Sequence, residues 1–168
     1  MRSKSDFEPS LIPDSWFRAR TLSSPMCELM EREDERRPLR AGERKLGRFV
    51  LPPFQRPPVW TETQKVRFIE SCWLGLPIGA YVVNAGRYQS PFDLWLIDGQ
   101  QRVTAVLNYM AGAFPVYGHR YGDLPKVDKR RWEWGMVFPK LETQIEDEAE
   151  LHEVYSRLAY GGTPHEPR

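Results

Sequence analysis

The chain has 168 residues and a formal net charge of +1, with 28% charged residues. This length suits one domain of ordinary size, and the near-neutral charge excludes general attraction to nucleic acid, so any such contact needs a local basic patch. The chain has two cysteines and three histidines, which argues against a disulfide framework or a structural zinc site. No apolar run is long enough to span a bilayer, so we expect a cytoplasmic protein.

The N-terminal quarter of the sequence looks least like core. Pro9, Pro13 and Pro25 interrupt any long element before residue 28. Residues 28–48 mix acidic and basic side chains around Pro38 and Gly42, which is typical of a solvated helix end and loop. We predict a partly irregular N-terminal arm over residues 1–45 and a folded domain over residues 46–168.

A short strand and a proline-rich segment open this domain. The strand begins at Phe49 and is cut short by the prolines at positions 52 and 53, and two more prolines follow Arg56. The result is a stiff arm that carries Gln55 and Arg56. Rigid placement suits binding because less ordering entropy is lost when a ligand arrives. The alternative is that Arg56 only pairs with a surface carboxylate.

A helix is predicted from Thr61, because Gln64 three residues later completes a capping box. Apolar side chains recur along one face of it, which we expect to be buried. Cys72 on this face is expected to be a packed hydrophobe and not a nucleophile. A strand over residues 78–83 and a polar loop over residues 84–91 follow. The expected inward stripe consists of Val66, Ile69, Cys72, Trp73 and Leu76.

Residues 94–110 (LWLIDGQQRVTAVLNYM) predict a buried strand, a tight turn at Asp98 and Gly99, and a helix. Four polar side chains fall at the helix start, where free N–H groups and the helix dipole favour an anion such as phosphate. An alternative stays open: Asp98 only caps the helix, Gly99 supplies a positive φ, and the other side chains point into solvent. The four polar residues are Asp98, Gln100, Gln101 and Arg102.

A basic cluster precedes two tryptophans further along the chain. Such a pattern can hold a phosphate backbone and stack on bases, but strand-like alternation from Trp132 through Trp134 to Phe138 favours a buried sheet face instead. The cluster is still the best candidate for a nucleic-acid contact, through Lys129, Arg130 and Arg131. A last helix is expected after the acidic residues 146–148, ended by Gly161 and Gly162.

The segment 97–102 (IDGQQR) resembles the signature of GmrSD-type restriction endonuclease N-terminal domains, which belong to the ParB/sulfiredoxin-like superfamily. Three further segments match in order: residues 51–60 (LPPFQRPPVW), residues 76–79 (LPIG), and residues 155–158 (YSRL) followed by 161–164 (GGTP). Together they cover residues 46–166. Ala159 departs from the family, which usually has asparagine there.

The resemblance implies an α/β (α+β) fold of ParB/sulfiredoxin-like type, a small mixed sheet flanked by helices. It also implies a nucleotide pocket near Gln55 and Arg56. Gly99, Gln100, Gln101 and Arg102 would contact its phosphates. Asp98 would hold Mg²⁺ or accept a proton, so Asp98 and Arg102 are the expected catalytic residues.

The function expected from this resemblance is an NTP-dependent phosphotransferase (kinase) or NTPase acting on nucleic acid, in bacterial or phage DNA modification or restriction. Its cofactors would be a nucleoside triphosphate and Mg²⁺, with DNA as a partner and room for a homodimer. We expect no fused nuclease domain. Two alternatives stay open: a non-catalytic module that senses a nucleotide and binds DNA or protein, and a domain that has lost its nucleotide pocket.

Overall fold

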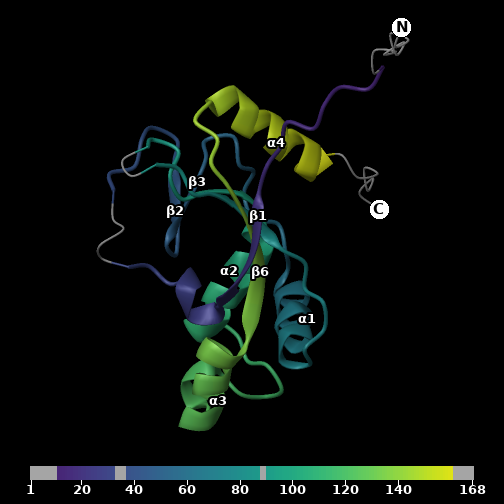
Figure 1. Cartoon of the computed structure of the whole chain (residues 1–168). Coiled ribbons are helices and arrows are strands. Elements are labelled where there is room, and N and C mark those ends of the chain that lie inside the picture. Colours follow the sequence, from purple (N-terminus) through teal and green to yellow (C-terminus); the bar gives the residue numbers. More distant parts are fainter. Residues whose placement is uncertain (1–10, 33–36, 88–89, 161–168) are drawn as a thin grey trace, which may run out of the picture.

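A computed structural model describes residues 11–32, 37–87 and 90–160 (Figure 1). Its strands are β1 (Arg20–Pro25), β2 (Arg44–Leu46), β3 (Phe49–Leu51), β4 (Tyr81–Asn84), β5 (Trp95–Asp98) and β6 (Val137–Thr143). Its helices are α1 (Glu62–Trp73), α2 (Gln100–Met110), α3 (Lys126–Arg130) and α4 (Glu148–Tyr160), with short helical turns η1 (Met26–Leu29), η3 (Tyr121–Asp123) and η4 (Arg131–Gly135). The segment 161–164, which includes the predicted helix stop at Gly161 and Gly162, lies outside the described residues, as does Pro9.

The strands form one mixed sheet in the order β1-β6-β4-β5-β3-β2. β4 is parallel to β6 and β3 is parallel to β5, while the other neighbouring pairs are antiparallel. The predicted α/β class, a small mixed sheet flanked by helices, is therefore confirmed.

Helices cover both faces of the sheet. On one face, Tyr81, Val83 and Leu96 pack with the buried stripes of α1 and α2. On the other face, Val82, Trp95 and Ile97 pack with Leu151, Val154 and Tyr155 of α4. Burial on both faces explains why residues 95–97 form a continuous apolar run without alternation.

The N-terminal region contributes more to the core than its sequence suggests. β1 pairs with β6 along its whole length, and Met26 and Leu29 of η1 are fully buried. Glu43, in the segment expected to be solvated, is also buried. The prediction of a solvated loop over residues 28–48 is wrong at Leu29 and Glu43, because the tertiary contacts that bury them are not visible in the local charge pattern.

Two further expectations need correction. Leu76 lies beyond the end of α1 and is half exposed, so it does not extend the inward stripe, and the strand expected from residue 78 begins at Tyr81. Residues 131–135 form a helical turn instead of a strand, and β6 begins only at Val137. Trp132 and Trp134 therefore do not share a sheet face. In the described part of the chain, the helices are too short or too polar to cross a bilayer.

Candidate functional site

An irregularity in β5 positions Asp98 at the end of the strand. The antiparallel register of β4 with β5 pairs Val82 with Asp98 but Val83 with Leu96, so Ile97 is an extra residue in β5. Such β-bulges bend a strand and re-aim the side chains that follow, and they are frequent beside functional sites. Here the strand turns at once into α2 through Gly99, whose φ of 95° is left-handed.

Asp98 and Arg102 form an ion pair across this turn. Arg102 Nη2 donates to Asp98 Oδ2 at 2.7 Å, and the side chains are 22% and 37% exposed, respectively. A Cβ atom at Gly99 would lie 3.5 Å from Arg102 Nη2, and one at Gly79 would overlap Arg102 Nη1. The guanidinium is thus seated against two glycines and directed toward Asp98, while both members of the pair remain accessible to solvent.

The start of α2 differs from the starts of the other two long helices. Thr61 and Gln64 form a full capping box on α1, as predicted, and Asp147 Oδ1 accepts a hydrogen bond from the Glu150 N–H of α4 at 2.9 Å. The N-cap of α2 is Gly99, which offers no side-chain cap, and the first turn contains no acidic residue. Asp98 therefore does not cap α2, as the alternative prediction had it, because the Asp98 carboxylate pairs with Arg102 instead.

Two glutamines of the expected site, Gln55 and Gln101, connect the proline-rich arm to the turn at Asp98 and Gly99 through hydrogen bonds. Gln55 Nε2 donates to the carbonyls of Leu96 and Ile97 at 2.9 and 3.1 Å, so one buried amide satisfies both carbonyls at the bulge. Gln101 Oε1 accepts from the N–H groups of Val59 and Trp60, both at 3.1 Å. These amides hold the backbone of the site in place.

The structure places the other two expected residues differently. Gln100 is buried, whereas Arg56 is exposed on the arm, where its N–H donates to the Tyr155 hydroxyl at 3.4 Å. The ion pair and the fastened arm are therefore adjacent elements of one region, while a direct contact of Arg56 with a nucleotide stays a prediction. An apolar groove of about 480 Å³ lies elsewhere, between the end of α1 and the start of β6.

The predicted nucleic-acid contacts lie on α3 and η4. Lys129 Nζ donates to the Gly122 carbonyl at 2.7 Å, and the Arg131 guanidinium lies 5.5 Å from the centre of the Trp73 ring. Arg130 is exposed between them. Trp132 is fully buried, whereas Trp134 is 65% exposed, because the helical turn points them in different directions.

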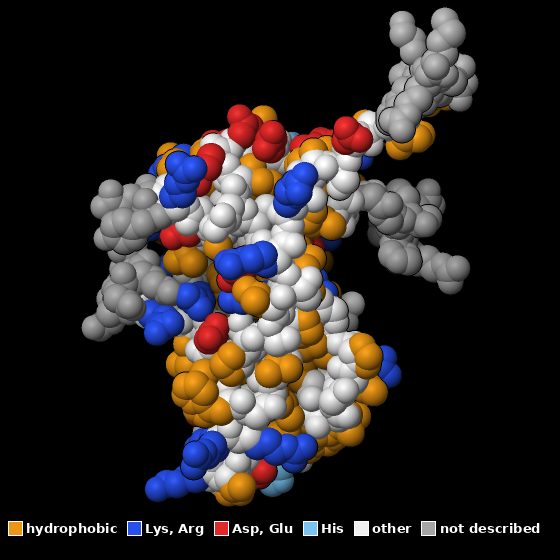
Figure 2. Space-filling view, in the orientation of Figure 1, with side chains coloured by type: hydrophobic (Ala, Val, Ile, Leu, Met, Phe, Trp, Pro, Cys, Tyr) orange, Lys and Arg blue, Asp and Glu red, His pale blue; other side chains and the backbone are white. Residues whose placement is uncertain are grey.

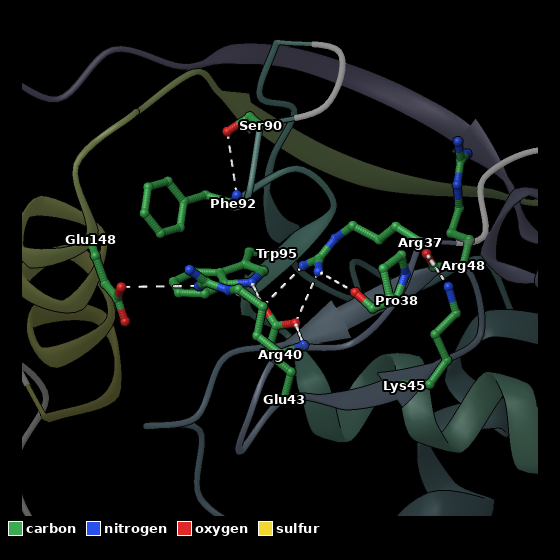
Figure 3. A network of polar contacts seen from close by, with 10 residues as sticks. All are labelled: Arg37, Pro38, Arg40, Glu43, Lys45, Arg48, Ser90, Phe92, Trp95 and Glu148. Atoms are coloured by element: carbon green, nitrogen blue, oxygen red, sulfur yellow. Dashed lines mark hydrogen bonds and ion pairs between the residues drawn. The ribbon is translucent and has the colours of Figure 1, made fainter.

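Sequence reasoning missed a buried carboxylate behind the sheet. Figure 3 shows the Glu43 carboxylate between Arg37 and Arg40 and beneath Trp95. Its side chain is fully buried, Arg37 donates to both of its oxygens, and Trp95 Nε1 donates to Oε1 at 2.7 Å. Burial alone would raise the pKa of this carboxyl, but the hydrogen bonds that it accepts outweigh burial and lower the pKa to about 2.

Arg40 extends this network to α4. Its guanidinium lies 5.1 and 5.2 Å from the ring centres of Phe92 and Trp95 and 4.0 Å from Glu148 (Figure 3). The carboxylate is enclosed and fully partnered, so the network ties the N-terminal segment and α4 to the sheet and offers no open position for a substrate. The sequence signal for this buried network was the mixture of acidic and basic residues around Arg37 and Arg40. Such a mixture is equally typical of a solvated loop.

These elements define an α/β domain whose strand-turn-helix unit carries an accessible acid-base pair at an uncapped helix start. The chain matches the family model described as "GmrSD restriction endonuclease, N-terminal domain" over residues 39–160, which is most of its length. It therefore belongs to this family, as the sequence motifs predicted. The comparisons with curated proteins and with solved structures gave no significant match. The finer placement in the ParB/sulfiredoxin-like superfamily stays a prediction.

Proposed function

We propose that the chain binds a nucleoside triphosphate at the start of α2 and uses it, with Mg²⁺, as an NTPase or phosphotransferase acting on nucleic acid in DNA restriction or modification. The family name, which refers to restriction endonucleases, supports the DNA-related part of the proposal. The observation that carries the nucleotide part is the uncapped start of α2 beside Arg102.

An uncapped helix start favours a phosphate for electrostatic reasons. The first N–H groups of a helix have no partner within it, and the dipole makes this end positive. At the starts of α1 and α4 a side chain accepts a hydrogen bond from one of these groups, whereas the N-cap of α2 is a glycine, which leaves its groups to another acceptor. Arg102, which lies one turn along, would add a full positive charge to the same anion.

Asp98 is the carboxylate that would approach the phosphates. In the described residues no group of three metal-ligating side chains is found. A single carboxylate, that of Asp98, fits Mg²⁺ bound to a nucleotide, because that ion is usually held by one or two carboxylates together with phosphate oxygens and water. Arg102 would then move from Asp98 to a phosphate. The pair is partly exposed, and breaking such a pair costs at most about 1 kcal/mol.

The experiment combines the full chain with ATP, GTP or CTP, Mg²⁺, and single- or double-stranded DNA carrying native or hydroxymethylated bases. We expect hydrolysis or label transfer, an about 100-fold slower reaction for Asp98→Asn, and about 10- to 100-fold weaker nucleotide binding for Arg102→Gln. Asp123→Asn, at an exposed position in η3, is the matched control and should behave as the parent chain.

The alternatives give different results in the same assay. Tight nucleotide binding without turnover in any combination would support the non-catalytic sensing module. A ligand that binds only the native state raises its stability, by about 2.7 kcal/mol at 100 times its Kd. A melting temperature that no nucleotide changes would therefore reject both the enzyme and the sensor.

A further inference from the structure

η4 places two tryptophans in opposite environments. Trp132 is fully buried, 5.0 Å from the Trp73 ring and 5.1 Å from the Tyr109 ring between centres. Trp134 follows two residues later and is 65% exposed. Trp is among the side chains that proteins bury most completely on average, so an indole held in solvent by an anchored turn is not explained by packing.

Trp134 borders a groove of about 680 Å³ on the basic end of the molecule. Lys126 and Arg130 are exposed at this groove, and Lys129 lies beside them, tied to the Gly122 carbonyl. Glu133 also lines it, but its carboxylate accepts a 2.6 Å hydrogen bond from the Tyr121 hydroxyl. Figure 2 shows basic side chains at the α3 end, as well as over the middle and upper parts of this face, and acidic side chains gathered at the opposite end, over α4.

We propose that α3 and η4 form a binding site for single-stranded nucleic acid, in which an unpaired base stacks on Trp134 and the phosphates beside it contact Lys126 and Arg130. Every base has a flat aromatic face, so stacking on an indole gives affinity without sequence preference. In a duplex these faces are covered by neighbouring bases, so the exposed indole favours an unpaired strand. The cations supply the local positive charge that the net charge of the chain does not.

This site is separate from the proposed nucleotide site. η4 packs through Trp132 on Tyr109, near the C-terminal end of α2, whereas Asp98 precedes the N-terminal end of that helix. The 11 residues of α2 span about 16 Å, at a rise of 1.5 Å per residue. Binding of a strand at Trp134 can therefore be measured without nucleotide, and its failure would leave the proposal for α2 untouched.

The test is fluorescence anisotropy of labelled oligothymidine and of a duplex of equal length, titrated with the full chain. We expect the single strand to bind more tightly than the duplex. Trp134→Ala should weaken its binding about 10-fold, the order expected for one stacked base, while Trp134→Phe keeps part of the affinity. Arg130→Gln should lower the slope of log K against log salt by about 0.7, since one phosphate contact is lost.

The chain offers matched controls for both changes. Trp16 is also an exposed tryptophan near arginines, and Arg157 is an exposed arginine that pairs with Glu153 on α4. Trp16→Ala and Arg157→Gln should leave binding unchanged, and circular dichroism should show the same fold for all variants. The proposal is overturned if the parent chain does not bind the single strand or if Trp134→Ala binds as tightly as the parent. It is also overturned if Trp16→Ala loses as much affinity as Trp134→Ala.

Discussion

The guanidinium of Arg102 lies against Gly79, so closely that a Cβ atom at position 79 would overlap Nη1. This contact joins two of the sequence segments that resemble the family, residues 76–79 and residues 97–102. Gly79 has a φ of +72°, and the absence of a side chain leaves the space that the guanidinium occupies. The glycine and the arginine thus form one unit that fixes where the positive charge lies relative to the start of α2.

Gly79→Ala should therefore weaken nucleotide binding at α2, because the added methyl group displaces the Arg102 guanidinium from the position beside the start of α2 from which it would reach a phosphate. Part of the charge-assisted contact would be lost, and we expect an affinity about 10-fold lower in a nucleotide titration. Strain at a positive φ should also lower the free energy of unfolding by about 1 kcal/mol.

Gly75→Ala separates these two effects. Gly75 has the same φ of +72°, but a Cβ atom there would meet nothing within 4 Å. We expect the same loss of stability from Gly75→Ala and unchanged nucleotide affinity. Equal affinity losses in the two variants would show that backbone strain, and not the position of Arg102, controls binding.

Gln55→Ala should lower the free energy of unfolding by about 1–3 kcal/mol. The change leaves the carbonyls of Leu96 and Ile97 without the amide that they share, and an unsatisfied buried polar group has a penalty of this order. Urea unfolding followed by circular dichroism measures the difference. Gln144→Ala, at an exposed position after β6, should change stability by less than about 0.5 kcal/mol. A similarly small effect at Gln55 would show that water replaces the amide.

The parts of the fold that could be predicted from sequence are those fixed by local chemistry. The capping box at Thr61 and Gln64 and the positive φ of Gly99 follow from interactions within a few residues. The apolar run of residues 95–97 marked the central strand because both of its faces are buried. The same short segment contains both Asp98 and Arg102, four residues later, but their ion pair was not predicted.

The parts that could not be predicted depend on contacts distant in the sequence. Trp132 and Trp134 fit a strand by spacing, but residues 131–135 form a helical turn, with Trp132 packed on Trp73 and Tyr109. Glu43 lies among charged residues that suggest a solvated loop. It is buried beside Trp95, which is 52 positions away in the sequence. Local pattern cannot distinguish these cases, because the partner that decides each one is remote.

Cys72 should be unreactive in the native protein. Burial on α1 raises the pKa of its thiol to about 12, so almost no thiolate, the form that reacts, is present at pH 8. With Ellman's reagent at this pH, followed by peptide mapping, we expect Cys72 to be labelled only after denaturation. Cys27 is half-buried and serves as the internal comparison. Native labelling of Cys72 as fast as that of a free thiol would contradict its place in the core.

Glu43 should make the protein sensitive to acid. Its pKa is lowered from 4.5 to about 2, so the ionised carboxylate stabilises the native state above pH 4.5, and this contribution is lost as the pH falls from about 4.5 to about 2. A shift of this size corresponds to about 3 kcal/mol. Free energies of unfolding from urea titrations at pH 7, 4 and 2.5 should decrease accordingly in the parent chain.

Glu43→Gln should remove most of this pH dependence. It should also lower stability at pH 7 by about 3–5 kcal/mol, because Arg37 and Arg40 lose the negative charge that they surround. Glu153→Gln, which changes an exposed carboxylate paired with Arg157, is the matched control and should retain the acid sensitivity of the parent chain. If Glu43→Gln kept the full decrease between pH 4.5 and 2, other carboxylates would be responsible for it. An unchanged stability at pH 7 would show that the arginines reach other partners or water once the charge is removed.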